Sequence, residues 1–240
     1  MEYRYDIHVH TQETSPCGHV PAADTVAAYH ALGYAGLCIT DHLHDGYLAR
    51  LDCQDDWQAC VTRYLAGYWA ARRAGEALGM DILLGLELRF PENDSDYLIY
   101  GVDEAWLRAN PYPCRMDHAA FFRRYGGSVL IIQAHPFRAC DEVFTDSIHG
   151  LEVANCNPRH DSRNDLALAL AAAHPSLYRL CGSDAHREGD EGRSAVVFEQ
   201  RVRDSFALKA AIESRRYRLW CPAYQNIIEK SEAIGCGTTL

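Results

Sequence analysis

Histidine, aspartate and glutamate recur at the ends of apolar, β-rich runs of this chain, and these side chains bind metal ions and move protons. The chain has 240 residues, 12 of them histidine. His8 and His10 stand two positions apart at the end of the run DIHVH. Side chains two apart on a strand leave the same face of a sheet, so both imidazoles can reach one metal ion. Taken alone, the pair would equally suit two ordinary histidines on an edge strand.

The same arrangement returns at six later points in the chain. Apolar runs are followed by one or two polar side chains, in the order Asp41 and His42, Glu87, Asp103, His135, Asn155 and Asn157, and Asp184 and His186. Parallel strands place their carboxyl ends on one face, so these distant clusters would converge there. Crowded imidazoles and carboxylates repel one another and lose solvation, and a divalent cation removes both problems. Nitrogen and oxygen donors favour zinc, manganese or iron over calcium.

The elements that must position these side chains alternate between short strands and longer helices. Apolar, β-rich runs predict strands at 3–10, 35–40, 82–88, 97–102, 129–134, 151–154, 177–182, 195–198 and 217–220. Spacing and propensity predict helices at 23–33, 57–78, 117–126 and 164–174. This alternation is typical of an α/β sheet or barrel with parallel strands and outer helices. No linker rich in proline, glycine or serine interrupts it, so we expect one domain over residues 1–240.

Composition limits the classes of function. The 33 acidic and 23 basic side chains give a net charge of −10, which fits a small substrate better than a nucleic acid. No run of 18 apolar residues predicts a membrane span, and the N-terminus MEYRYDIHVH lacks the layout of a signal peptide. We therefore expect a cytoplasmic protein. The ten cysteines contain no CxxC pair, which favours mostly reduced thiols over a disulfide framework or a zinc knuckle.

Taken in order, the motifs H-x-H, T-D-H, an isolated glutamate, A-H-P and G-S-D-A-H resemble the polymerase and histidinol phosphatase (PHP) superfamily. The resemblance runs from Tyr5 to about Phe198. It implies a TIM-like, distorted (β/α)7 barrel. It also implies two or three divalent ions, Zn, Mn or Fe, in a site that hydrolyses phosphoesters.

The resemblance also implies a set of metal ligands. One ion would be held by His8, His10, Glu87 and Asp184. Glu87 would bridge to a second ion held by His135. Family members often place a histidine after the fourth strand, where this chain has Asp103, so Asp103 would take that position as a ligand.

A third ion would be held by His42 and His186, according to the same resemblance. The remaining ligand position lies in the loop after the first strand. Cys17 is the first choice there, with Glu13 and His19 as alternatives. A thiolate at this position would favour zinc.

Further residues are candidates for acting on a substrate. Arg138, three residues after His135, could bind a phosphate with two hydrogen bonds, although most arginines are solvated surface groups. Weaker candidates for the same role are Arg159 and His160. Asp184 belongs to the catalytic set, and His186 or His44 could protonate the leaving group. Asp41 is expected to orient a ligand or to cap a helix.

These inferences predict a metal-dependent hydrolase that cleaves the phosphoester of a small phosphorylated metabolite through a metal-activated hydroxide. One alternative is a metallohydrolase that acts on an amide or a lactone. The other is a metal-stabilised PHP module without catalytic activity. The absence of GxGxxG, Walker and GxSxG motifs argues against dinucleotide, NTPase and serine-hydrolase functions.

Overall fold

The computed structural model describes residues 2–228, apart from residues 54, 141 and 227. Its strands are β1 (Tyr3–Val9), β2 (Gly36–Ile39), β3 (His42–Leu43), β4 (Asp81–Leu84), β5 (Leu86–Arg89), β6 (Asp96–Tyr100), β7 (Leu130–Gln133), β8 (Gly150–Asn155), β9 (Tyr178–Gly182), β10 (Ala195–Phe198) and β11 (Tyr217–Trp220). Its α-helices are α1 (Ala22–Ala31), α2 (Asp45–Leu48), α3 (Trp57–Tyr64), α4 (Ala66–Leu78), α5 (Glu104–Ala109), α6 (His118–Tyr125), α7 (Asn164–Ala173) and α8 (Ser205–Glu213). Short 3₁₀ turns lie at Ala49–Leu51, Pro113–Arg115 and Thr145–Ser147.

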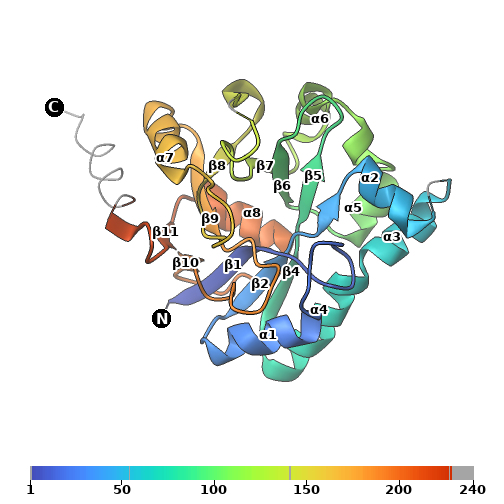
Figure 1. Ribbon diagram of the computed structural model, residues 1–240, viewed down its shortest axis with the longest axis horizontal. Helices are drawn as coiled ribbons and strands as arrows, with labels where there is room; N and C mark the ends of the chain where they lie inside the picture. Colours follow the sequence, from blue (N-terminus) through green and yellow to red (C-terminus); the bar gives the residue numbers. More distant parts are fainter. Residues whose placement is uncertain (1, 54, 141, 227, 229–240) are drawn as a thin grey trace.

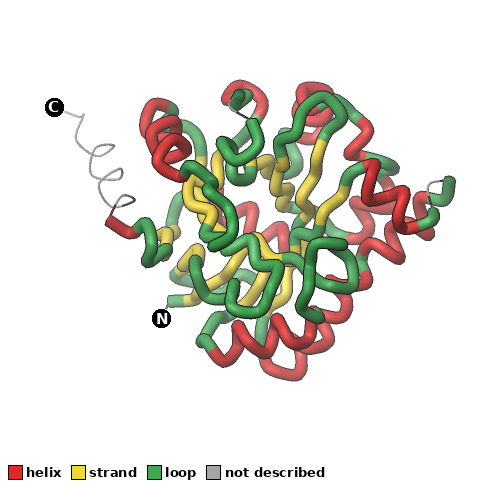
Figure 2. The backbone as a smooth tube through the Cα atoms, in the orientation of Figure 1, coloured by secondary structure: helices red, strands yellow, loops and turns green. Residues whose placement is uncertain are grey.

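Two sheets form the wall of a distorted barrel with helices on the outside (Figures 1 and 2). Their strand orders are β11-β10-β1-β2-β4 and β3-β5-β6-β7-β8-β9. The chain passes directly from β2 to β3 and from β4 to β5, so each pair continues from one sheet into the other. On the other side, a parallel bridge between Val9 and Ala185 joins β1 to the segment after β9. The two sheets therefore enclose one core.

Strand direction departs from an all-parallel barrel at β10, which is antiparallel to β1 and β11, and at β6. The pairs β1–β2, β2–β4, β3–β5, β7–β8 and β8–β9 are parallel, but β6 is antiparallel to both β5 and β7. Asp96, the first residue of β6, pairs with Arg89, the last residue of β5. The amino end of β6 therefore lies beside the carboxyl ends of its neighbours.

The core strands are buried on both faces, as expected where helices cover the outside of a barrel. All residues of β7 and β8 are buried. Helix α4 packs closely against β4, because a Cβ at Gly75 would lie 2.4 Å from a side-chain atom of Ile82. Glycine is therefore required at this contact between helix and strand.

The predicted elements correspond to the observed ones with a few physical differences. The predicted strand 82–88 is split at Gly85, where an added Cβ would lie 2.9 Å from atoms of Cys38 and Thr40. The predicted helix 57–78 is divided at Leu65 into α3 and α4. Helices α5 and α8 were not predicted. Each begins after an aspartate, Asp103 or Asp204, whose carboxylate accepts a backbone N–H of the first turn.

Four of the cysteines form disulfides, although mostly reduced thiols are expected from the sequence. The structure contains the disulfides Cys53–Cys60 and Cys156–Cys221, which corrects that expectation for these four residues. The second joins residues 65 positions apart, so its two cysteines are brought together by the tertiary structure and not by a local motif. Cys236 lies outside the described residues. Among the described helices, none combines the length and the apolar character needed to cross a membrane.

Candidate metal centre

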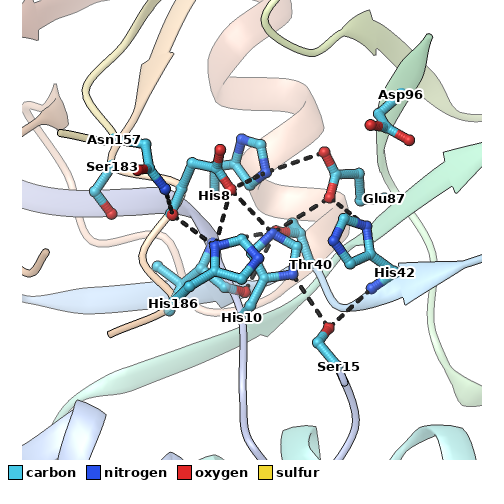
Figure 3. Close-up of polar contacts among 12 residues, drawn as sticks. His8, His10, Ser15, Thr40, His42, Glu87, Asp96, Asn157, Ser183 and His186 are labelled. Carbon is cyan, nitrogen blue, oxygen red and sulfur yellow. Dashed lines mark hydrogen bonds and ion pairs between the residues drawn. The ribbon is translucent and has the colours of Figure 1, made fainter. Parts of the chain in front are cut away.

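Imidazoles and carboxylates from distant parts of the chain meet at the carboxyl ends of the parallel strands (Figure 3). Their nitrogen and oxygen atoms form groups of three in which all atoms lie within 4.8 Å of one another. Such spacing allows three donors to surround one ion. The groups are His8–Glu87–His135, His8–His10–Asp184, His10–His42–His186 and His42–Glu87–Asp96.

Glu87 lies at the middle of this cluster, and its side chain is fully buried. One of its oxygens, Oε1, lies 3.3 Å from His8 Nε2 and 3.1 Å from His135 Nε2. The other, Oε2, lies 3.3 Å from His10 Nε2 and 2.8 Å from His42 Nδ1. Burial raises the pKa of Glu87, but the neighbouring imidazoles outweigh that effect and hold the pKa well below its usual value. A carboxylate with each oxygen facing two imidazoles has the arrangement needed to bridge two ions.

The ring protons of three histidines are held away from the centre of the cluster. Nδ1 of His8 lies 2.8 Å from Glu152 Oε1, and Nδ1 of His186 lies 2.8 Å from the carbonyl oxygen of Asp184. Nδ1 of His10 lies 3.2 Å from Ser15 Oγ. Carboxylate and carbonyl oxygens only accept hydrogen bonds, so they place a ring proton of His8 and of His186 on Nδ1 and leave Nε2 to face the cluster. The hydroxyl of Ser15 donates to Asp41, so its oxygen can accept from His10 Nδ1 in the same way.

The residues present fit divalent ions, as two unpartnered atoms show. Nε2 of His8 and Nε2 of His10 are buried and make no hydrogen bond. They lie 3.4 and 3.3 Å from the same atom, Asp184 Oδ1. Buried nitrogen atoms and a carboxylate oxygen at these distances have the arrangement that suits a cation between them. Neutral imidazoles and carboxylates are also the donor types that zinc, manganese and iron accept.

Asp41 supports the cluster from behind. Its carboxylate accepts hydrogen bonds from the backbone N–H and the hydroxyl of Thr11 and from the hydroxyl of Ser15. Burial raises the pKa of Asp41 to about 6, although these hydrogen bonds act in the opposite direction. The oxygen of Ser15 in turn faces His10 Nδ1 and accepts the backbone N–H of His42. Asp41 therefore orients two of the candidate ligands through Ser15.

Of the three residues considered for the loop after the first strand, Cys17 is the one that lines the clefts beside the cluster, together with His42. Cys17 is exposed, and its thiol belongs to none of the four groups of donor atoms described above. Desolvation raises the pKa of this thiol, but the imidazoles of His186 and His42 outweigh that effect and lower the pKa to about 6. The Glu13 carboxylate instead accepts the backbone N–H of Ala22 at the start of α1. The side chain of His19 is exposed, and only its backbone N–H contacts the site, through the carbonyl of His186.

The interpretation of Asp103 as a ligand is corrected by the structure. Asp103 follows the carboxyl end of β6 and caps α5, where its carboxylate accepts the backbone N–H of Trp106 at 2.7 Å. Because β6 is antiparallel to its neighbours, this end of the strand points away from the cluster. Asp96, at the opposite end of β6, reaches the site instead. Its Oδ2 lies 3.9 Å from His135 Nε2, and both its oxygens accept hydrogen bonds from Arg89.

Two candidate ligands have an unusual backbone conformation. His135 has φ of 29° and Asp184 has φ of 53°, values that non-glycine residues adopt at an energetic cost. Hydrogen bonds hold Asp184 in place: its N–H donates to the carbonyl of His8, and its carbonyl accepts from Asn157 Nδ2. The surrounding network thus maintains a strained conformation at the centre of the site.

The arginines considered for phosphate binding line a cleft of about 270 Å³ beside the cluster. Arg138 donates to Asp184 Oδ2 and Asn155 Oδ1, each at 2.7 Å, and to Ser162. Arg159 donates two hydrogen bonds to Asp190, which also accepts the backbone N–H of His186. Both guanidinium groups therefore already bind carboxylates that shape the site.

Two histidines considered for roles toward the substrate lie at the rim of the site. His160 lines the same cleft and is exposed. His44 lines an adjoining cleft with Cys17 and His42. Burial lowers the pKa of His44, and the charges of His42 and Arg89 lower it further.

Three residues that the sequence interpretation missed contact the site. Asp96 escaped notice because the direction of β6 was unknown, and Ser15 because a serine in a loop is unremarkable. Glu152 carried a detectable signal. It is the acidic residue inside the otherwise apolar run GLEVA, and it is fully buried on β8.

The family model of the PHP domain matches residues 6–209. The chain belongs to the PHP family. The matched segment contains all the clustered residues described above, and the barrel of this chain is the distorted α/β barrel typical of PHP domains. No curated protein matches the sequence.

Two solved structures show the same PHP fold. A two-domain protein from Bacteroides vulgatus ATCC 8482 is described as containing a PHP-like metal-dependent phosphoesterase; it is 17% identical, with a TM-score of 0.65 over 92% of this chain and 65% of its own. A metal-dependent phosphoesterase from Bifidobacterium adolescentis ATCC 15703 is 16% identical, with a TM-score of 0.52 over 87% of this chain and 95% of its own. In both descriptions the phosphoesterase is itself a prediction. This chain thus spans about two thirds of the first structure and shares its fold.

Proposed function

We propose that the protein is a metal-dependent phosphoesterase that hydrolyses a small phosphorylated metabolite. The observation that carries this proposal is the position of Glu87 between four imidazoles, with the unpartnered Nε2 atoms of His8 and His10 facing Asp184. Membership of the PHP family and the printed descriptions of the two similar structures support phosphoester hydrolysis as the reaction.

The candidate ligands divide into three groups in this proposal. Glu87 would bridge the first two ions, and a third ion would complete the site. The first ion would be held by His8, His10 and Asp184, the second by His135 with Asp96 nearby, and the third by His42, His186 and Cys17. Divalent ions bound there would supply Lewis acidity toward a water molecule and toward the phosphoryl oxygens.

The chain itself provides orientation and charge around the phosphoryl group. Arg138 contacts Asp184 and lines the cleft, so its guanidinium keeps Asp184 in place and would lie beside a phosphate bound at the cluster. Arg159 holds Asp190 and, through it, the backbone of His186. His160 is the exposed base at the rim of the cleft. We assign protonation of the leaving oxygen to His44, which lines the adjoining cleft, or, where the third ion is not bound, to His186, which lines the cleft at the cluster.

The cleft dimensions support a small substrate. The cleft at the cluster holds about 270 Å³ and the adjoining cleft about 380 Å³. Both contain Cys17, His42 and Arg89. A substrate could therefore place its phosphoryl group at the cluster and the rest of the molecule in the adjoining cleft.

A metal and turnover experiment tests this function. Purified protein is analysed for bound metal and assayed with an aryl phosphate, an aryl phosphodiester and a lactone, with and without a chelator. We expect phosphoester hydrolysis that chelation abolishes, restored by Zn²⁺ or Mn²⁺, and a loss of activity in Asp184→Ala with the fold retained. Lactone hydrolysis alone would replace the proposal with another metallohydrolase reaction. Metal-dependent melting without turnover of any ester would indicate a structural PHP module.

A further inference from the structure

Glu152 is a buried carboxylate that lies behind the clustered residues and belongs to none of the four groups of donor atoms. Its Oε1 lies 2.8 Å from His8 Nδ1. Its Oε2 accepts the backbone N–H of His135 at 3.0 Å and Nδ2 of Asn155 at 2.9 Å. Each of its contacts is thus made to a residue of the site, although Glu152 itself does not face the centre.

We infer that Glu152 is a positioning residue that sets the metal affinity of both halves of the bridged centre. It fixes the ring proton of His8 on Nδ1, which leaves the Nε2 lone pair for a metal. It also holds the backbone of His135, the residue whose φ of 29° must be maintained for its imidazole to reach Glu87. The inference rests on the metal centre of the proposed function.

The chemistry of its three partners explains why a carboxylate stands at position 152. His8 Nδ1–H, the backbone N–H of His135 and the amide of Asn155 are all donors. Only a group with two acceptor oxygens satisfies all three. A glutamine would turn its NH₂ group toward either His8 or the His135–Asn155 pair, so one donor would face another. A glutamine is therefore close in shape to glutamate, but it cannot accept all three hydrogen bonds.

The neighbouring strand is adapted to the Glu152–His8 contact. Gly182, the last residue of β9, lies where a Cβ would come within 2.4 Å of His8 Cβ and 2.6 Å of Glu152 Oε1. A side chain at position 182 would displace the pair. This observation is independent of the hydrogen bonds and gives the same conclusion: the local structure keeps space for this contact.

The contact network extends from Glu152 to Asp184. Asn155 Nδ2, which donates to Glu152, also lies 3.3 Å from Asp184 Oδ2, and Asn155 Oδ1 accepts from Arg138. Changes at Glu152 should therefore weaken ion binding by His8, His135 and Asp184 together. Among the described residues, no hydrogen bond joins Glu152 to His10, His42 or His186. Ion binding by this third group should therefore change least.

The test uses Glu152→Gln with Asp81→Asn as its matched control. Asp81 is a carboxylate at the other end of the barrel, where it accepts hydrogen bonds from Tyr5 and Arg201. Zn²⁺ affinity of the metal-free proteins is measured by competition with a chromophoric chelator, and folding by circular dichroism and thermal melting. We expect about 10- to 100-fold weaker Zn²⁺ binding for E152Q and unchanged binding for D81N. Folded E152Q with wild-type affinity would overturn the inference.

A spectroscopic readout separates positioning from general structural support. In ¹⁵N spectra of the Zn²⁺-loaded proteins, the wild type should show the His8 ring proton on Nδ1, and E152Q should show a mixture of tautomers. An unchanged His8 tautomer in E152Q would also count against the inference.

If E152Q does not fold, Glu152→Asp keeps the charge but shortens the side chain, and it should also weaken Zn²⁺ binding.

The two proposals fail in different ways. Weaker Zn²⁺ binding by E152Q together with no hydrolysis of any phosphoester by the wild type would retain the positioning role and reject the proposed function. If the wild type hydrolyses a phosphoester and E152Q binds Zn²⁺ as tightly as the wild type, the proposed function is retained and the positioning role is rejected. Failure of the wild type to bind Zn²⁺, Mn²⁺ or Fe²⁺ would reject both.

Discussion

Two acidic side chains near opposite ends of the β4–β5 segment have very different partners. Asp81, at the start of β4, accepts a hydrogen bond from the Tyr5 hydroxyl at 2.7 Å and from Arg201 Nε at 2.8 Å. Glu87, on β5, is surrounded by imidazoles. Arginine carries a permanent positive charge, whereas an imidazole is charged only when protonated. The charge of Asp81 is therefore balanced by the chain itself, and the surroundings of Glu87 suit ions taken from solution.

Along the β4–β5 segment, Asp81 stabilises the fold, and Glu87 belongs to the candidate metal centre. The amino end of the barrel is completed by hydrogen bonds and an ion pair within the protein. The carboxyl end keeps buried nitrogen lone pairs without partners. This division agrees with the general placement of active sites at the carboxyl ends of barrel strands.

The largest effect is expected from exchanging each acid for its amide. Glu87→Gln removes the bridging charge, and we expect a fall of roughly 10²- to 10³-fold in aryl phosphate hydrolysis, since it removes electrostatic stabilisation at the reacting centre. Asp81→Asn should keep the wild-type rate but lose about 1–3 kcal/mol of unfolding free energy. Turnover assays and denaturant titrations measure the two effects. A slow D81N enzyme or a fully active E87Q enzyme would contradict the division.

A smaller effect should distinguish the two aspartates at the ends of β6. Asp96→Ala removes a carboxylate near His135 and releases Arg89. We expect about tenfold weaker metal binding for D96A. Asp103→Ala removes the cap of α5 and should cost about 1 kcal/mol of stability without changing metal affinity. Chelator competition and thermal melting of both variants measure the two effects. Weaker metal binding by D103A together with unchanged binding by D96A would indicate that Asp103 is the ligand.

The smallest effect is expected at the edge of the site, at Cys17. With its pKa lowered to about 6, this thiol is largely a thiolate at neutral pH and available as a ligand. The cobalt-loaded protein should show a near-ultraviolet charge-transfer band that Cys17→Ser removes, with roughly tenfold weaker binding of one ion. Cys140→Ser, a change at another free cysteine outside the cluster, is the matched control. A band retained in C17S would exclude thiolate ligation by Cys17.

Much of the candidate site was accessible from the sequence because its signals are local. The H-x-H spacing at His8 and His10 places both side chains on one face, whatever the rest of the chain does. Apolar runs marked the strands, and the polar residues after them marked the strand ends, which is how Glu87, His135 and Asp184 were found. The family resemblance then gave the order of the ligands, and the PHP domain match over residues 6–209 confirmed the family.

The errors arose where position depends on contacts between distant segments. The prediction of Asp103 as a ligand was wrong because the sequence of a short apolar strand does not show its direction in the sheet. Only the pairing with β5 and β7 shows that β6 is antiparallel. The pairing of Cys156 with Cys221 depends on how the segment after β8 approaches the segment after β11. Neither relation is encoded in local spacing.

The sequence by itself determined the donor types, their placement at strand ends and the barrel that gathers them, because apolar periodicity and strand length are properties of short segments. Only the tertiary structure decided that Asp96 and not Asp103 lies near His135, that Cys17 lines the clefts with His42, and that Glu152 holds His8 and His135. Those contacts depend on strand direction and loop path, which are set by the packing of the whole chain.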